Sequence, residues 1–137
     1  MTPDADFNWV RERSECSAGK IFQQLALELE QDVGAINSLR GSSPRYGFNF
    51  KQVGASISVS VEGNRLNRSV VFSLDDNRIL VRLPGEKSFA ATVTLCNDGK
   101  CRLRVNEETY SSWQFRKMTL EDLFFNDPWL SPSEVKP

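Results

Sequence analysis

Residues 44–61, PRYGFNFKQVGASISVSV, decide the fold of this 137-residue chain, because the spacing of the apolar residues changes there. Apolar side chains occupy every second position in two runs of the stretch, at Tyr46, Phe48 and Phe50 and at Ile57, Val59 and Val61. A period of two is typical of a β-strand with one buried face. The stretch therefore predicts two half-buried strands.

The segment before Pro44 has the period of an amphipathic helix instead. From about Ser17 to Leu39 the apolar residues recur three or four positions apart, and Gly41 follows as a stop signal. Ser14 or Ser17 is placed to cap the first turn. We therefore expect one helix of about 23 residues, roughly 35 Å long.

The alternation continues downstream in four more runs. Their apolar positions are Val70, Phe72 and Leu74; Ile79, Val81 and Leu83; Phe89, Ala91, Val93 and Leu95; and Cys101, Leu103 and Val105. We predict an α+β fold in which the long N-terminal helix packs across one face of a six-stranded antiparallel meander, followed by a short C-terminal helix. Residues 1–137 are expected to form a single domain, with flexible termini at 1–13 and 131–137.

A two-residue turn at Gly63-Asn64 fits this meander. It would pair Val61 with Leu66 and keep the apolar residues of both strands on one face.

The stretch CNDGKC, Cys96–Cys101, joins two of the predicted strands, and its register decides where two of the three cysteines point. A two-residue turn would set the cysteines face to face but would turn Arg102 toward the core. A three-residue loop that ends at Gly99 in the left-handed conformation keeps the apolar residues on one face. We therefore predict that Cys101 points inward as a small apolar side chain, that Cys96 points outward and that no disulfide joins them.

The composition argues against several kinds of site. The chain has 17 Lys and Arg against 18 Asp and Glu, so no overall positive charge favours nucleic acid or a membrane surface. It has no histidine, which removes histidine-based triads and histidine-containing metal sites. No glycine-rich phosphate loop follows a predicted strand. We expect no metal, no cofactor and no catalytic residue, and a binding protein rather than an enzyme.

The N-terminus and the cysteines predict a soluble, cytoplasmic protein. MTPDADFNW, residues 1–9, is acidic where a secretory signal would be basic and then apolar, and no apolar run is long enough for a membrane span. Three cysteines, an odd number, fit a reducing compartment. Cys16 falls at the start of the predicted helix, opposite its apolar stripe, so we expect it to lie apart from the other two.

Two charged residues fall on predicted core faces. Asp32 lies near the middle of the apolar stripe of the helix, and Arg68 has the same parity as Val70 and Phe72. A buried carboxylate needs a partner, so we expect the two to form a pair. The pair either sits at the rim of the core without a function or lines a pocket in which Arg68 binds an anionic group and Asp32 accepts a hydrogen bond or a proton.

The C-terminal stretch TLEDLFFNDPWL, residues 119–130, predicts a short helix. Thr119 followed three positions later by Asp122 resembles a capping box, and Pro128 limits the run. We expect helix from about Leu120 to Phe125.

The aromatic surface of this stretch must be covered. Either the segment folds back on the core of its own chain, or Phe125, Trp129 and Leu130 anchor a second chain.

The function expected from the sequence is a non-catalytic binding or protein-interaction domain, whose partner is another protein or a second copy of the chain. The alternative is a binder of a small anionic ligand, or a simple enzyme, that uses Asp32 and Arg68 in a pocket between helix and sheet.

Overall fold

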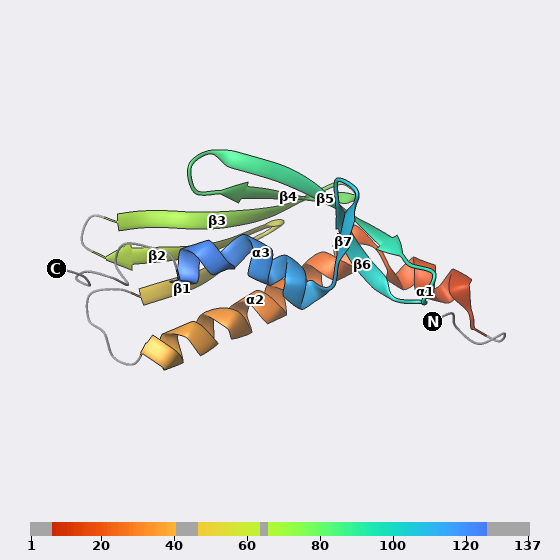
Figure 1. Cartoon of the computed structure of the whole chain (residues 1–137), viewed down its shortest axis with the longest axis horizontal. Helices are drawn as coiled ribbons and strands as arrows, with labels where there is room; N and C mark the ends of the chain where they lie inside the picture. The colour runs from red at the N-terminus through yellow and green to blue at the C-terminus, as the bar shows by residue number, and fades with distance from the viewer. Residues whose placement is uncertain (1–6, 41–46, 64–65, 126–137) are drawn as a thin grey trace.

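In the part of the chain that the structure describes, a seven-stranded antiparallel sheet carries two long helices on one of its faces (Figure 1). The computed structural model of the chain describes residues 7–40, 47–63 and 66–125. The elements, in chain order, are α1 (Trp9–Glu15), α2 (Ala18–Arg40), β1 (Gly47–Val53), β2 (Ser56–Gly63), β3 (Leu66–Asp75), β4 (Arg78–Leu83), β5 (Lys87–Leu95), β6 (Cys101–Val105), β7 (Glu108–Tyr110) and α3 (Ser112–Phe125). This confirms the predicted α+β class, with an N-terminal helix on an antiparallel meander and a C-terminal helix.

Helix α2 begins and ends close to where the sequence predicted. The Ser17 hydroxyl accepts a hydrogen bond from the Lys20 backbone N–H at 3.3 Å, so Ser17 is the capping residue. The apolar stripe of the helix is buried against the sheet, through Phe22, Leu25, Leu29, Val33 and Ile36.

The face of the sheet toward the helices carries the alternating apolar residues. Ile57, Phe72 and Val81 form one continuous row across β2, β3 and β4. None of the three is more than 1% exposed. Burying each such side chain stabilises the fold by roughly 1.5–3 kcal/mol, so this row holds the helices to the sheet.

The side chain of Asn37 joins the end of α2 to the edge strand β1. Its amide donates to the Phe48 carbonyl at 2.9 Å and accepts from the Phe48 N–H at 3.0 Å. An edge strand has backbone groups without a ladder partner, and one asparagine here satisfies two of them. The last turns of α2 therefore lie alongside β1.

The sheet has one strand more than the sequence predicted. Strand β7 pairs with β6 through Leu103 and Tyr110, and Asn106 takes a positive φ of 57° in the turn between them. The strand is only three residues long, with exposed Glu108 and Thr109, so it has no alternation of apolar residues from which to predict it.

The register between β2 and β3 also differs from the predicted one. Gly63 pairs with Leu66 and Val59 with Val70, which displaces the pairing by two residues. A displacement of two leaves every side chain on its predicted face, because the strand period is two. Burial patterns alone do not separate these two registers.

Helix α3 is longer than the sequence predicted. It begins at Ser112, and the Ser111 N–H donates to the Gln114 side chain at 3.0 Å across its first turn. Thr119, predicted as the cap, lies inside the helix, where it is buried and donates to the Arg116 carbonyl at 3.0 Å. A threonine can make this local bond within a helix, so its presence alone does not mark a helix start.

The loop at Cys96–Cys101 has the predicted register. Leu95 pairs with Cys101, the Cys96 N–H donates to the Lys100 carbonyl at 2.9 Å, and Gly99 has a φ of 81°. No disulfide joins Cys96 to Cys101, as predicted, and Cys96 carries a free thiol.

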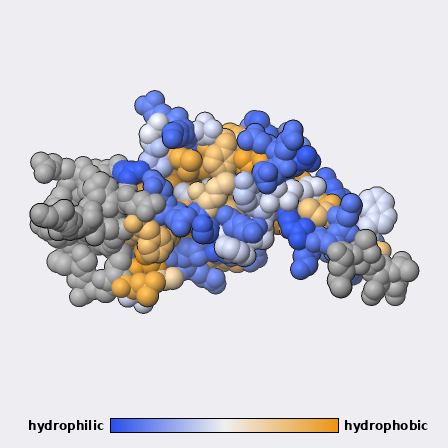
Figure 2. Space-filling view, in the orientation of Figure 1, coloured by the Kyte–Doolittle hydropathy of each residue, from blue (hydrophilic) through white to orange (hydrophobic). Residues whose placement is uncertain are grey.

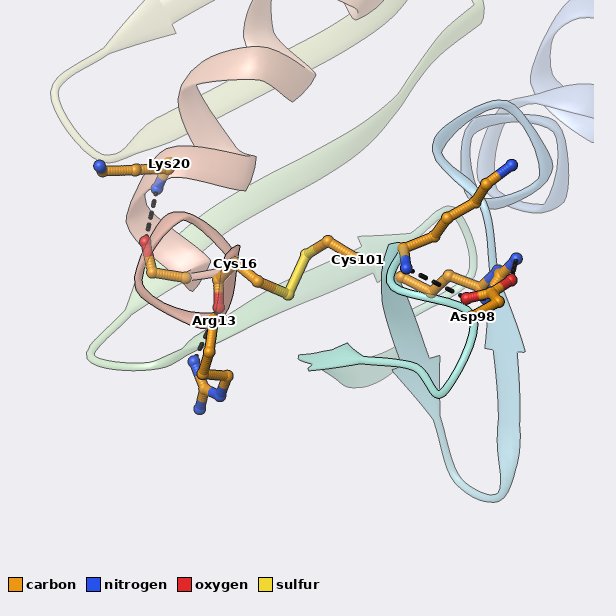
Figure 3. Close-up of a disulfide and its surroundings, with 8 residues drawn as sticks. Arg13, Cys16, Lys20, Asp98 and Cys101 are labelled. Carbon is orange, nitrogen blue, oxygen red and sulfur yellow. Dashed lines mark hydrogen bonds and ion pairs between the residues drawn. A yellow bond between two sulfur atoms is a disulfide. The ribbon is translucent and has the colours of Figure 1, made fainter. Parts of the chain in front are cut away.

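The prediction for Cys16 was wrong. Cys16 is 1% exposed and forms a disulfide with Cys101, 85 residues away in the chain, with 5.5 Å between the two Cα atoms (Figure 3). Cys16 is the C-terminal cap of α1, which occupies residues that the sequence assigned in part to a flexible terminus. The disulfide therefore fastens the junction of α1 and α2 to strand β6.

Asp98, in the loop between β5 and β6, should titrate at an unusually low pH. The Arg102 guanidinium donates to its carboxylate at 2.6 and 2.9 Å, and the Lys100 N–H donates at 3.1 Å. These bonds, led by those from Arg102, lower the pKa of Asp98 to about 2. The folded pKa lies below the unfolded one, so the stabilisation is complete above the ordinary pKa of 3.8 and is lost as the pH falls through about 2.

A carboxyl-carbon NMR titration of Asp98 measures this pKa. In Arg102→Gln the pKa should rise toward 3.8, whereas Arg104→Gln on the same strand should leave it unchanged. An Asp98 midpoint already near 3.8 in the original chain would contradict the prediction.

Candidate functional site

A groove of about 400 Å³ runs between the C-terminal half of α2 and helix α3. Ile36, Leu120 and Phe124 form its buried floor. Figure 2 shows hydrophobic side chains gathered over the C-terminal half of α2 and the end of α3, next to charged ones. The groove is therefore an apolar hollow that opens to the surface between two helices.

Three large apolar side chains on the rim of the groove are exposed. Leu39 on α2 is 80% exposed, and Trp113 and Phe125 on α3 are 59% and 58% exposed. Single exposed apolar residues are common on proteins, but three around one apolar hollow form a patch.

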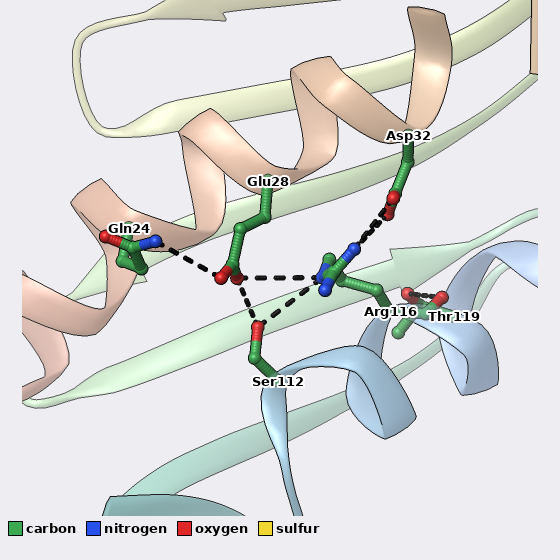
Figure 4. A network of polar contacts seen from close by, with 6 residues as sticks. All are labelled: Gln24, Glu28, Asp32, Ser112, Arg116 and Thr119. Carbon is green, nitrogen blue, oxygen red and sulfur yellow. Dashed lines mark hydrogen bonds and ion pairs between the residues drawn. The ribbon is translucent and has the colours of Figure 1, made fainter. Parts of the chain in front are cut away.

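A network of charged and polar side chains joins the two helices beside the groove (Figure 4). Arg116 on α3 donates to both carboxylate oxygens of Asp32 at 2.7 Å, and its Nε lies 3.6 Å from a carboxylate oxygen of Glu28. The Ser112 hydroxyl donates to Glu28, and Gln24 donates to the same carboxylate at 3.2 Å. Two carboxylates one helical turn apart thus hold one guanidinium, which fixes α3 against α2.

Asp32 has a partner, as predicted, but the partner is Arg116 and not Arg68. Arg68 instead lies next to Asp122 on α3. Its guanidinium is 3.5 Å from the Asp122 carboxylate, and 30% of its side chain is exposed. The groove reaches Asp32 but is not lined by Arg68. Asp32 and Arg68 therefore pair with different residues, and the groove does not join them.

Helix α3 presents one more pattern toward the groove. Trp113, Lys117, Glu121 and Phe125 follow one another at intervals of four residues, and all four line the groove. Lys117 and Glu121 form an exposed ion pair at 3.0 Å. We call these four residues the α3 ridge.

Of the three anchor residues predicted from the sequence, one falls within the described residues. Phe125 lies on the rim of the groove, as part of the α3 ridge. Trp129 and Leu130 fall outside the described residues. Sequence reasoning named neither Trp113 as an anchor nor Arg116 as the partner of Asp32. The signal that was present is the interval of eight residues between Phe115 and Leu123, about two helical turns, which fits a helix that starts earlier.

The described residues offer no arrangement for metal chemistry. Within 7–40, 47–63 and 66–125, no three Cys, Asp or Glu side chains gather as a metal ion would need. In the same ranges no helix is long and apolar enough to cross a membrane.

Comparison of the chain with protein-family models, with curated proteins and with solved structures finds no match.

Proposed function

We propose that this protein is a non-catalytic protein-interaction domain and that the groove between α2 and α3 is its binding surface. The observation that carries the proposal is the exposure of Leu39, Trp113 and Phe125 around one apolar hollow of about 400 Å³. Such a patch in water favours burial against a second surface. Aromatic side chains at the rim are the residue type that most often anchors a protein interface.

The shape and charge of the groove indicate the kind of partner. It lies between two helices, and its polar lining carries both signs of charge, on Asp32, Glu121, Arg116 and Lys117. A partner helix with apolar residues on one face and charges beside them matches this surface. We therefore expect an amphipathic helical segment as the ligand.

A pocket for a small anion is not proposed as a second function. Arg116 is the guanidinium that lines the groove, and Asp32 and Glu28 already offset its charge. Arg68 lies elsewhere, beside Asp122. No feature of the described residues favours a free anion over a protein partner.

The disulfide also indicates the kind of cellular compartment in which this domain works. The sequence led us to expect the cytoplasm, where disulfides are rarely kept. The bond joins Cys16, which is 1% exposed, to the half-buried Cys101. We infer that the domain works where the environment is oxidising enough to keep this disulfide.

A library of displayed peptides, panned against the dilute full chain, tests the binding surface. Peptides that bind should carry apolar residues at helical spacing, and Trp113→Ala should weaken their binding by about tenfold or more, as expected for an interface anchor. Trp9→Ala is the matched control, because Trp9 is 63% exposed but lies on α1, away from the groove. Peptides that bind both variants equally, or no binding peptides at all, would contradict the proposal.

A further inference from the structure

The α3 ridge is complementary to a reversed copy of itself. In chain order its four residues are an aromatic, a cation, an anion and an aromatic: Trp113, Lys117, Glu121 and Phe125. All four are exposed side chains on one helix. When the order is reversed, aromatic again meets aromatic and each charge meets the opposite charge.

When two copies of α3 lie antiparallel, both aromatic pairs and both opposite-charge pairs come into contact in the same arrangement. Trp113 and Phe125 lie six residues on either side of position 119, and Lys117 and Glu121 lie two residues on either side. With a rise of 1.5 Å per residue these offsets are about 9 Å and about 3 Å along the helix. A two-fold axis at this level therefore places Trp113 beside Phe125 of the second copy and Lys117 beside its Glu121.

A row of side chains four residues apart is also a common contact surface between two packed helices. Rows of side chains at intervals of four lie side by side when two helices cross at about −50°, the commonest class of helix packing. Each ridge would then enter the apolar groove of the other copy, beside Leu39 on α2.

We propose that the partner in the groove is a second copy of this chain, held by an antiparallel contact between the two α3 ridges. The proposal rests on the interaction function proposed above and names its partner. Complementary charge favours the second copy over an unrelated helix, because Lys117 and Glu121 occupy the two central positions of the ridge. In an antiparallel pair, each Lys117 then faces the Glu121 of the other copy. The contact is small, since it is formed by the half-exposed Trp113 and Phe125, by Leu39 and by two ion pairs. We expect a weak dimer, half formed at roughly 10–100 μM protein.

Charge reversal provides the test, with the association state measured by sedimentation equilibrium on the full chain. Lys117→Glu sets four carboxylates at the centre of the dimer, and Glu121→Lys sets four ammonium groups there. Each change should weaken the dimer by about tenfold or more. The double variant K117E/E121K restores two complementary pairs and should dimerise within about threefold of the original chain, and it also keeps an opposite-charge pair within the helix.

A mixture of the two single variants adds a result that damage to the fold cannot produce. In the mixed pair, the two carboxylates at positions 117 and 121 of the Lys117→Glu chain would face the two ammonium groups of the Glu121→Lys chain. An equimolar mixture should therefore form heterodimers although each variant alone is monomeric. Trp113→Ala should also weaken the dimer, and Trp9→Ala should not.

Three results would overturn the second copy as partner: a chain that stays monomeric up to about 500 μM, a dimer insensitive to both charge reversals, or single variants whose mixture stays monomeric. A chain that ends at Phe125 and dimerises while the full chain does not would also overturn it, and would assign the groove to residues 126–137. The first three results leave the interaction function itself untouched. The last would remove it as well, because the groove would then be filled by the chain's own residues, and the function also falls if Trp113-dependent peptide binding is absent.

Discussion

Loss of the Cys16–Cys101 disulfide should lower the free energy of unfolding by about 4–5 kcal/mol. The bond closes a loop with a sequence separation of 85 residues. Opening a loop of this length returns a large conformational entropy to the unfolded chain, and the chain-entropy relation gives about 4.6 kcal/mol at 25 °C. A loss of this size is a third or more of the stability of most domains.

Urea unfolding of the oxidised chain, the reduced chain and the variant C16A/C101A measures this loss. The reduced chain and the variant should lose stability equally. Cys96→Ala is the matched control, because Cys96 is a half-buried free thiol outside the disulfide, and its stability should change by less than about 1 kcal/mol. Equal stability of the oxidised and reduced chains would show that the bond is absent in solution or that the unfolded chain is already compact.

The local part of the cysteine arrangement could be predicted from the sequence, and the long-range part could not. The loop at Cys96–Cys101 follows from the faces of two adjacent strands, since only one register keeps arginines out of the core. The pairing of Cys16 depends on where a helix ends 85 residues earlier. The helical projection that set Cys16 opposite the apolar stripe fails because α1 ends there and α2 begins only at Ala18.

The candidate site was predictable to a similar extent. The apolar stripe of α2 singled out Asp32 as a charge that needs a partner, and the structure provides one. The choice of Arg68 followed from strand parity, which fixes the face of the sheet but not the position along it. Arg116 was overlooked because α3 was expected to begin at Leu120, so that residue 116 had no element to position it. The groove depends on the first two turns of α3, which the sequence analysis left out.

Replacement of Phe115 by alanine should destabilise the fold by about 3–5 kcal/mol. Phe115 is fully buried, and its ring centroid lies 6.3 Å from those of Phe72 and Phe89 on the sheet. The change leaves a cavity between α3 and the sheet that the well-packed strands cannot close, so transfer energy and packing are both lost.

Phe125→Ala is the matched control for this prediction, because the same residue type on the same helix is 58% exposed there. Its effect on the unfolding of the monomer should be below about 0.5 kcal/mol, while its effect should appear in sedimentation as weaker self-association. Unfolding at two protein concentrations separates monomer stability from dimer formation. If Phe115→Ala costs no more than Phe125→Ala, α3 is not docked on its own sheet. The groove, which needs both helices on one face, would then not exist in solution.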